Sequence, residues 1–187
     1  MKKTVRTCIP VHFPKGMLMS DAILDIAAST RFYRTSALQR VDLILRENDT
    51  FYELTLMSEK ESDEYEMLTC LSRAAEGASR IITFNGHSFD LPHLRGKYRA
   101  YRLEDPFEGK EDFDLIRELW GLASFFGLPS NQLRDYAAFL GLPTGAEKDL
   151  SDPGAKPSFC DAEIALELMS LFSFLSFLRG EDCRKRE

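Results

Sequence analysis

The chain has 187 residues, of which 44% are hydrophobic and 29% charged, with a formal net charge of −6. This length and composition are ordinary for one globular domain with a hydrophobic core. The excess of acidic residues argues against a broad surface that binds nucleic acid electrostatically, because proteins that bind phosphates in this way normally have a basic surface patch. A small acidic site that approaches a phosphate through metal ions stays compatible with this charge.

The cysteines and the N-terminal residues bear on the compartment. The four cysteines, at positions 8, 70, 160 and 183, form no CxxC pair, and the three histidines add no zinc-ligand spacing. This pattern is typical of free thiols in a reducing compartment, so we expect a cytoplasmic protein. Pro10 and Pro14 interrupt any apolar N-terminal run, which argues against a signal peptide. No run reaches the ~18 apolar residues of a membrane span.

The first half of the chain predicts four strands and one helix. Residues 22–28 form an apolar run with Asp25 at its centre, as in a buried strand. Residues 40–45 and 51–57, with a polar turn between them, predict a hairpin. Residues 59–77 have helical apolar spacing with acids in the first turn and Gly77 at the end. Residues 79–84 predict the next strand, which ends at Asn85-Gly86.

The second half predicts mostly helices. We expect helices over residues 91–103, 112–127, 130–143 and 158–180, and a loop over 145–157. The element order predicts an α/β fold with a mixed central sheet. The first three strands would form an antiparallel meander, and a crossover helix would return the chain beside the first strand. We find no repeat or linker and predict a single domain over residues 1–187.

Three aspartates stand out from this pattern. Asp25 lies inside an apolar strand, where a charge is rarely buried without a partner or a metal; the alternative is a side chain at the strand edge in solvent. Asp90 follows the strand at 79–84, and its alternative role is an N-cap for the helix that starts near Pro92. Asp161 falls on the apolar side of the last predicted helix, opposite Glu163 and Glu167. Its alternative role is a first-turn acid favoured by the helix dipole.

Two strands and one helix could bring these three carboxylates to one end of the sheet. Oxygen ligands of this kind suit hard divalent cations such as Mg²⁺ or Mn²⁺. Two such ions about 3.5–4 Å apart can activate water and stabilise the leaving oxygen in phosphodiester hydrolysis. We therefore predict that Asp25, Asp90 and Asp161 converge.

The stretch Phe84-Asn-Gly-His-Ser-Phe-Asp90 carries a family resemblance. It resembles the N-x-x-x-F-D second motif of the DEDD 3′–5′ exonucleases of the RNase H-like superfamily, and the YprB-type RNase H-like domain in particular. The resemblance extends over about residues 18–178 and includes an aspartate-led helix and the stretch "NQLRDYAAFLG". It implies the RNase H-like fold, with helices on both faces of the sheet.

The resemblance also assigns roles to residues of this chain. It implies that Asp25, Asp90 and Asp161 are catalytic metal ligands in a two-metal site for Mg²⁺ or Mn²⁺. It implies that Asn85 fixes the turn or contacts the substrate. The chain departs from the family at its first motif, D-I-E-T-T-G, because Ala27 stands where the family has a metal-binding glutamate. A third-motif Tyr or His near Asp161 is not evident either.

Two functions follow as expectations. The first is a metal-dependent nuclease of the DEDD 3′–5′ exonuclease type that hydrolyses phosphodiester bonds in DNA or RNA, impaired by the loss of the first-motif glutamate. The alternative is a catalytically inactive RNase H-like module that binds nucleic acid or a protein partner. The apolar surface of the helix near Ser158–Leu178 predicts burial on more than one side. This burial would come from packing against other helices of the chain, or from a partner protein or a second copy.

Overall fold

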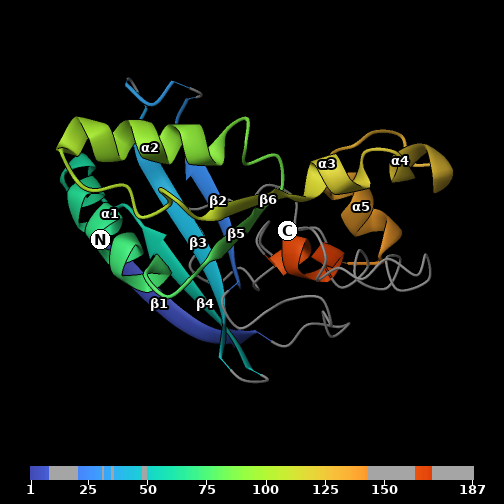
Figure 1. The fold of residues 1–187 in the computed structure, drawn as a ribbon, viewed down its shortest axis with the longest axis horizontal. Coiled ribbons are helices and arrows are strands. Elements are labelled where there is room, and N and C mark those ends of the chain that lie inside the picture. Colours follow the sequence, from blue (N-terminus) through green and yellow to red (C-terminus); the bar gives the residue numbers. More distant parts are fainter. Residues whose placement is uncertain (9–20, 31, 35, 48–49, 143–162, 170–187) are drawn as a thin grey trace. The chain divides into compact units, whose positions relative to one another are not determined.

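The structure of the chain is a computed structural model that describes most of the first 142 residues and one short C-terminal segment (Figure 1). The described residues are 1–8, 21–30, 32–34, 36–47, 50–142 and 163–169. They group into two compact units: one holds residues 1–9 and 17–115, and the other holds residues 10–16 and 116–187.

A six-stranded mixed sheet forms the centre of the first unit (Figure 1). Its strands in spatial order are β1 (Lys2–Cys8), β4 (Thr50–Met57), β3 (Leu38–Glu47), β2 (Asp21–Ala28), β5 (Arg80–Thr83) and β6 (Glu111–Asp114). The pairs β1–β4, β4–β3 and β3–β2 are antiparallel, whereas the pairs β2–β5 and β5–β6 are parallel. The predicted mixed sheet with an antiparallel meander is therefore confirmed.

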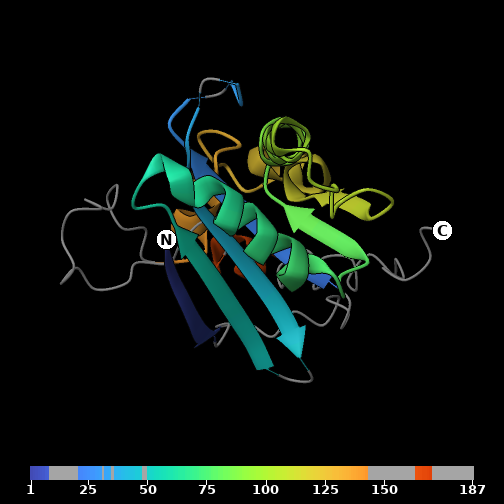
Figure 2. The same ribbon diagram turned by 90° about the vertical axis from the view of Figure 1, so that its left-hand side faces the viewer.

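Two helices cover one face of this sheet. α1 (Glu64–Ala75) follows the 3-10 turn η1 (Glu61–Asp63), and α2 (Asp90–Tyr101) follows β5. α1 crosses the sheet over β3, and α2 packs against β2 (Figure 2). The core between helices and sheet contains alternate residues of the central strands, as the period of two requires. Its fully buried members include Leu24, Val41, Leu56, Met67, Leu71, Leu94 and Tyr98.

The second unit contains short helices. These are α3 (Leu115–Leu119, whose first residue still belongs to the first unit), α4 (Leu122–Phe125), α5 (Leu133–Phe139) and the helical residues 163–169. The Tyr136 hydroxyl donates to the Leu119 carbonyl and contacts Asn131, which ties α5 to the end of α3. Within the described part of the chain, no helix is long and apolar enough to cross a membrane.

Sequence reasoning missed one element and assigned another to the wrong class. β1 was not predicted, although it pairs along its whole length with β4. The predicted helix at 112–127 begins instead as strand β6 and is interrupted before α4 at Gly121. Residues Glu111–Asp114 extend the parallel sheet because Arg80 to Thr83 leave an edge for them to pair with. The aspartates at 112 and 114 therefore lie on a strand, not in a first helical turn.

The described part of the C-terminal helix is buried around its circumference. Residues 164–169 are all buried, which confirms burial on more than one side for this segment. Glu167 is only 2% exposed, so the assignment of Glu167 to an outward face was wrong. Asp161, Phe174 and Phe177 lie outside the described residues. The predicted partner or second copy at this helix stays a prediction.

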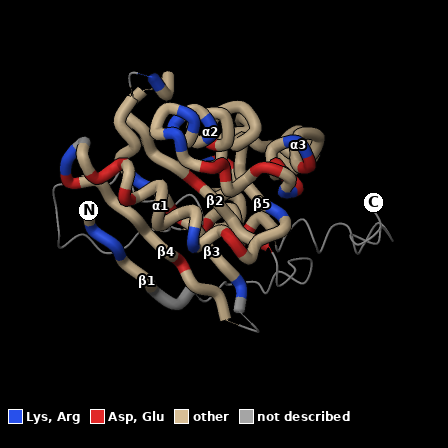
Figure 3. The backbone as a smooth tube through the Cα atoms, turned by 60° about the vertical axis from the view of Figure 1, so that its left-hand side comes forward, with Lys and Arg blue, Asp and Glu red and all other residues tan. Residues whose placement is uncertain are grey.

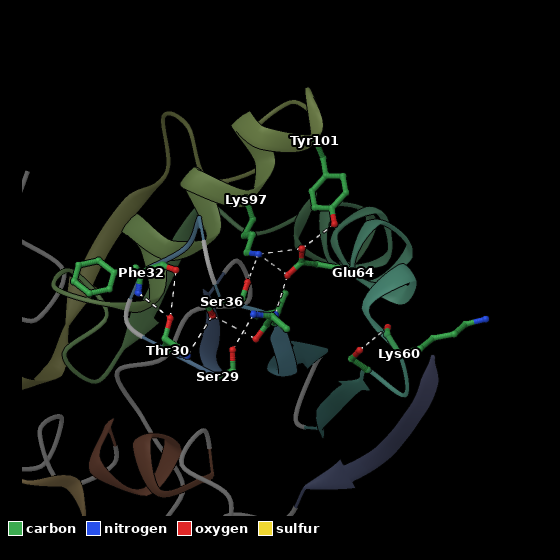
Figure 4. A network of polar contacts seen from close by, with 11 residues as sticks. Ser29, Thr30, Phe32, Ser36, Lys60, Glu64, Lys97 and Tyr101 are labelled. Atoms are coloured by element: carbon green, nitrogen blue, oxygen red, sulfur yellow. Dashed lines mark hydrogen bonds and ion pairs between the residues drawn. The ribbon is translucent and has the colours of Figure 1, made fainter.

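A buried ion pair joins the two helices to the connection between β2 and β3 (Figure 4). Lys97 Nζ of α2 lies 2.8 Å from the Glu64 carboxylate of α1, and both side chains are 8% exposed. Glu64 also accepts hydrogen bonds from the Leu38 N–H at 2.8 Å and the Tyr101 hydroxyl at 2.8 Å. Lys97 donates in addition to the Ser36 carbonyl. The network fixes where β3 begins.

Candidate functional site

The turn between β5 and α2 carries Asp90, and its backbone explains the Asn-Gly pair. Asn85 adopts a left-handed conformation with φ of 65°, which asparagine tolerates better than most residues. A Cβ at position 86 would lie 2.3 Å from the Thr83 side chain, so only glycine fits there. The Gly86 carbonyl then accepts from the Leu91 N–H at 3.0 Å. The turn thereby fixes the start of α2 at Asp90.

Asp114, at the end of the neighbouring strand β6, holds this turn in place. Its Oδ1 accepts from the Asn85 N–H at 2.6 Å and its Oδ2 from the His87 N–H at 3.2 Å. The Asp114 side chain is buried, and hydrogen bonds to an ionised acceptor are stronger than neutral ones. Sequence reasoning missed Asp114, because β6 was assigned to a helix.

We expect Asp114→Ala to loosen the turn. The substitution leaves two backbone N–H groups without their charged acceptor, which should lower the free energy of unfolding by roughly 2–4 kcal/mol. Asp112→Ala is the matched control, because Asp112 contacts only the exposed ring of His87 within the described turn and a surface pair contributes about 0–1 kcal/mol. Urea denaturation compares the two variants; equal losses would contradict the role of Asp114.

Asp90 is brought against the strand that carries Asp25. Asp90 is 4% exposed, and its Oδ1 accepts a hydrogen bond from the Ile26 N–H at 2.9 Å. β2 pairs with β5 only over Asp21–Ile23. Farther along β2, the Asp90 carboxylate accepts the hydrogen bond from the Ile26 N–H. Asp90 is the first residue of α2 and Phe89 occupies the N-cap position, so the N-cap alternative is wrong.

The face of the sheet that carries Asp25 also carries an ion pair. Asp25 lies opposite Asp42, and Ala27 opposite Arg40, in the pairing of β2 with β3. Residues directly opposite one another project to the same face, so all four share it. Arg40 Nε lies 2.6 Å from Asp42 Oδ2, and Thr55 donates to Asp42 at 2.7 Å. Burial raises the pKa of Asp42, and the Arg40 charge opposes that shift.

These residues meet the requirements of a metal site only in part. Asp25 carries a carboxylate on β2 and Asp90 carries one beside Ile26 of the same strand, but the exposed Ala27 supplies none. Arg40 adds a positive charge to the face where a second cation would bind. Among the described residues, no group of three His, Cys, Asp or Glu side chains could hold a metal ion. Asp161, the third predicted ligand, lies outside the described residues, so its convergence with the other two stays a prediction.

His93, one turn after Asp90 on α2, is a buried polar side chain. It is 3% exposed, its ring packs against Phe89 at 5.6 Å between centroids, and neither ring nitrogen has a hydrogen-bond partner among the described residues. Burial and then the charge of Lys97 lower the pKa of His93, while Glu64 opposes the shift. The neutral imidazole is therefore the form compatible with the fold.

We expect acid to destabilise the fold through His93. The unfolded chain binds a proton near pH 6.5, and the folded chain does so only at lower pH. The contribution of the neutral His93 to stability is therefore complete above about pH 6.5. It falls as the pH drops towards the folded-state pKa, by up to about 1.4 kcal/mol per pH unit. His93→Met should remove this component. Urea denaturation at pH 7.5 and 5.5 measures it, and an unchanged pH dependence in the variant would contradict it.

The sheet order, the two helices on one face and the motif turn together define an RNase H-like fold. Residues 41–153 match the RNase H superfamily, which is more than half of the chain and includes Asp90. The chain belongs to this superfamily, as its sequence motif predicted. No curated protein matches the chain in sequence.

Two solved structures of exonuclease I share the fold. The apo structure of exonuclease I superposes with a TM-score of 0.57 at 12% identity, over 84% of this chain and 44% of that one. The product-bound structure of exonuclease I gives a TM-score of 0.58 at 12% identity, over 84% of this chain and 46% of that one. This chain therefore spans less than half of the length of either protein. At this identity the likeness establishes the fold alone.

Proposed function

We propose that the chain is a nuclease-type domain that binds nucleic acid and hydrolyses its phosphodiester bonds at the end of β2, with activity weakened by Ala27. The hydrogen bond from the Ile26 N–H to the Asp90 carboxylate carries the proposal, because it brings the second-motif acid to the strand of Asp25. Membership of the RNase H superfamily and the fold shared with exonuclease I support it.

In this proposal, Asp25 and Asp90 hold Mg²⁺ or Mn²⁺, and Asp161 is the third ligand. A divalent ion between these carboxylates would supply a Lewis acid and an activated water. Asp90 is fixed by the Ile26 N–H and by the turn that Asp114 holds, so its oxygens need little reorganisation when a substrate arrives. Asn85 is exposed at the tip of the turn, which supports a contact with the substrate.

A second candidate is a module that binds nucleic acid without hydrolysing it. Arg40 favours this candidate, because its guanidinium lies on the Asp25 face opposite Ala27 and already pairs with Asp42. A resident cation next to the site weakens the attraction for a metal ion. Both candidate functions include binding of nucleic acid, and they differ in whether the bound strand is hydrolysed.

The test is hydrolysis of two substrates in Mn²⁺: the p-nitrophenyl ester of thymidine 5′-monophosphate, and an end-labelled single-stranded oligonucleotide. The proposal expects slow hydrolysis of both by the wild type, lost in EDTA and reduced at least about 100-fold in Asp25→Asn and Asp90→Asn. Asp112→Asn, which changes an acid outside the proposed ligand set, should keep wild-type rates. Hydrolysis that survives in both Asn variants overturns the proposal. Oligonucleotide binding with no hydrolysis establishes the second candidate instead.

A further inference from the structure

Strand β1 forms one edge of the sheet, and no other strand of the described residues lies on its outer side. The spatial order of the sheet begins with β1, which pairs along its whole length with β4. Figure 2 shows β1, in dark blue, at this edge. In an antiparallel pair, part of the backbone N–H and C=O groups point away from the partner strand. Lys2–Cys8 therefore presents a row of backbone donors and acceptors to which a further strand can bind.

β1 is basic, although the chain as a whole is acidic. Its sequence, KKTVRTC, contains three basic residues and no acidic one, whereas the chain has a net charge of −6. The blue segment at the start of β1 in Figure 3 marks Lys2 and Lys3, and both residues are exposed. Neither lysine forms an ion pair with an acidic side chain of the described residues. Their charge is therefore available to a partner.

A groove between β1 and α1 continues this basic surface onto the helix. Its volume is about 580 Å³, and its lining includes Lys3, Tyr65 and Arg73. Glu66 is the one acid in the lining, so the charged side chains of the groove carry a net positive charge. Arg73 is exposed and, like Lys3, forms no ion pair with an acid of the described residues. The groove therefore favours an acidic ligand.

Exposed apolar surface lies along the same edge. Val5 is 59% exposed and Tyr65 is 52% exposed. Val5 lies opposite Leu54 in the pairing of β1 with β4, and Leu54 belongs to the core that α1 covers. Residues directly opposite one another project to the same face, so Val5 and Lys3, two residues apart on β1, both project to the α1 side. A strand added to β1 would find both a cation and an apolar side chain there.

The charges of the edge discriminate between possible occupants. Two copies of β1 would place two basic strands beside each other, and like charges on adjacent strands repel. Lysine on an edge strand is a common protection against such self-pairing. A nucleic-acid strand complements the positive charge but offers no row of amide and carbonyl groups to the backbone edge. An extended peptide with acidic side chains complements both the backbone and the charge.

We propose that the β1 edge binds an extended acidic segment of a partner protein, which adds to the sheet as a further strand. Backbone hydrogen bonds hold the segment along Lys2–Cys8, and its acidic side chains contact Lys3 and Arg73. β4 and β3 separate β1 from β2, which carries Asp25. The surface is therefore distinct from the candidate site, and the proposal does not depend on nuclease activity.

A labelled, terminally blocked heptapeptide that alternates glutamate and valine is the probe for this surface. Fluorescence anisotropy should show saturable binding with a Kd below about 1 mM. Lys3→Glu with Arg73→Glu should weaken binding at least about 10-fold, because each change replaces an attraction by a repulsion. Lys3→Gln with Arg73→Gln should weaken it less. The matched control, Arg34→Glu with Arg99→Glu, reverses two exposed charges on other elements and should keep the wild-type affinity.

Hydrogen exchange of the β1 amides tests the addition of a strand. A saturating amount of the heptapeptide should slow the exchange of the outward-facing β1 amides at least about 10-fold, because they gain hydrogen-bond acceptors. A second peptide with proline in place of each valine has the same charge but lacks half of the N–H groups of a strand. This peptide should not bind.

The results that would overturn the proposal are distinct from one another. Equal affinity for the proline peptide, or peptide binding that leaves β1 exchange unchanged, would show attraction by charge alone. Preferential binding of a single-stranded oligothymidine, lost in Lys3→Glu with Arg73→Glu, would assign the surface to nucleic acid. Concentration-dependent dimerisation that protects the same amides without peptide would assign the edge to a second copy. Folded wild-type protein that does not bind the heptapeptide would also overturn the proposal.

Discussion

Ala27→Glu is expected to raise Mn²⁺-dependent hydrolysis by roughly 100-fold. The substitution adds a carboxylate two residues from Asp25 on the same face of β2, where the family motif has its glutamate. Ala27 is exposed, so the larger side chain fits without overpacking the core. Initial rates on the p-nitrophenyl ester of thymidine 5′-monophosphate, at several Mn²⁺ concentrations, measure the gain in rate and in metal affinity.

Arg40 decides how large this gain is. A glutamate at position 27 lies directly opposite Arg40 and can pair with it instead of a metal ion. Arg40→Gln with Asp42→Asn removes the existing ion pair as a unit, which avoids leaving a buried charge alone. We expect Ala27→Glu to gain more in this background. No gain in either background, with the fold intact, would show that the missing glutamate is not what limits the site.

Lys97→Met is expected to lower the free energy of unfolding by about 3–5 kcal/mol. It removes the cation from a buried pair and leaves the Glu64 carboxylate with hydrogen bonds from the Leu38 N–H and the Tyr101 hydroxyl. This is a large fraction of the stability of a domain of this size. Urea denaturation of the wild type and the variant at pH 7.5 measures the loss.

A double variant separates the ion pair from simple packing. Lys97→Met with Glu64→Gln removes both charges and should be less destabilised than the sum of the two single variants. Arg99→Met, on the exposed side of the same helix, should change stability by no more than about 0.5 kcal/mol. A loss below about 1 kcal/mol for Lys97→Met would contradict the importance of the network in Figure 4.

The sequence predicted the features that depend on local pattern. Asp25 inside an apolar strand, and the Asn85-Gly86 turn that leads to Asp90, could be read from alternation, turn chemistry and motif spacing. Asp25 lies in strand β2, and the turn directly follows β5. The antiparallel meander followed from the short polar turn between β3 and β4.

The features that depend on distant partners could not be predicted. β1 is a strand because β4 offers it an edge, and β6 is a strand because β5 does. The position of Arg40 opposite Ala27 depends on the register between β2 and β3, which composition does not specify. Glu167 has helical spacing typical of an outward face and is nevertheless buried. Such tertiary contacts override local preference.

Calorimetric titration with Mn²⁺ tests most directly whether Asp25 and Asp90 form one metal-holding site. The account predicts that the wild type binds Mn²⁺ and that Asp25→Asn and Asp90→Asn each weaken binding at least about 10-fold. The double variant should lose little more than either single one, because both residues serve the same ion. Wild-type Mn²⁺ affinity in both single variants, with the fold intact, would contradict the account.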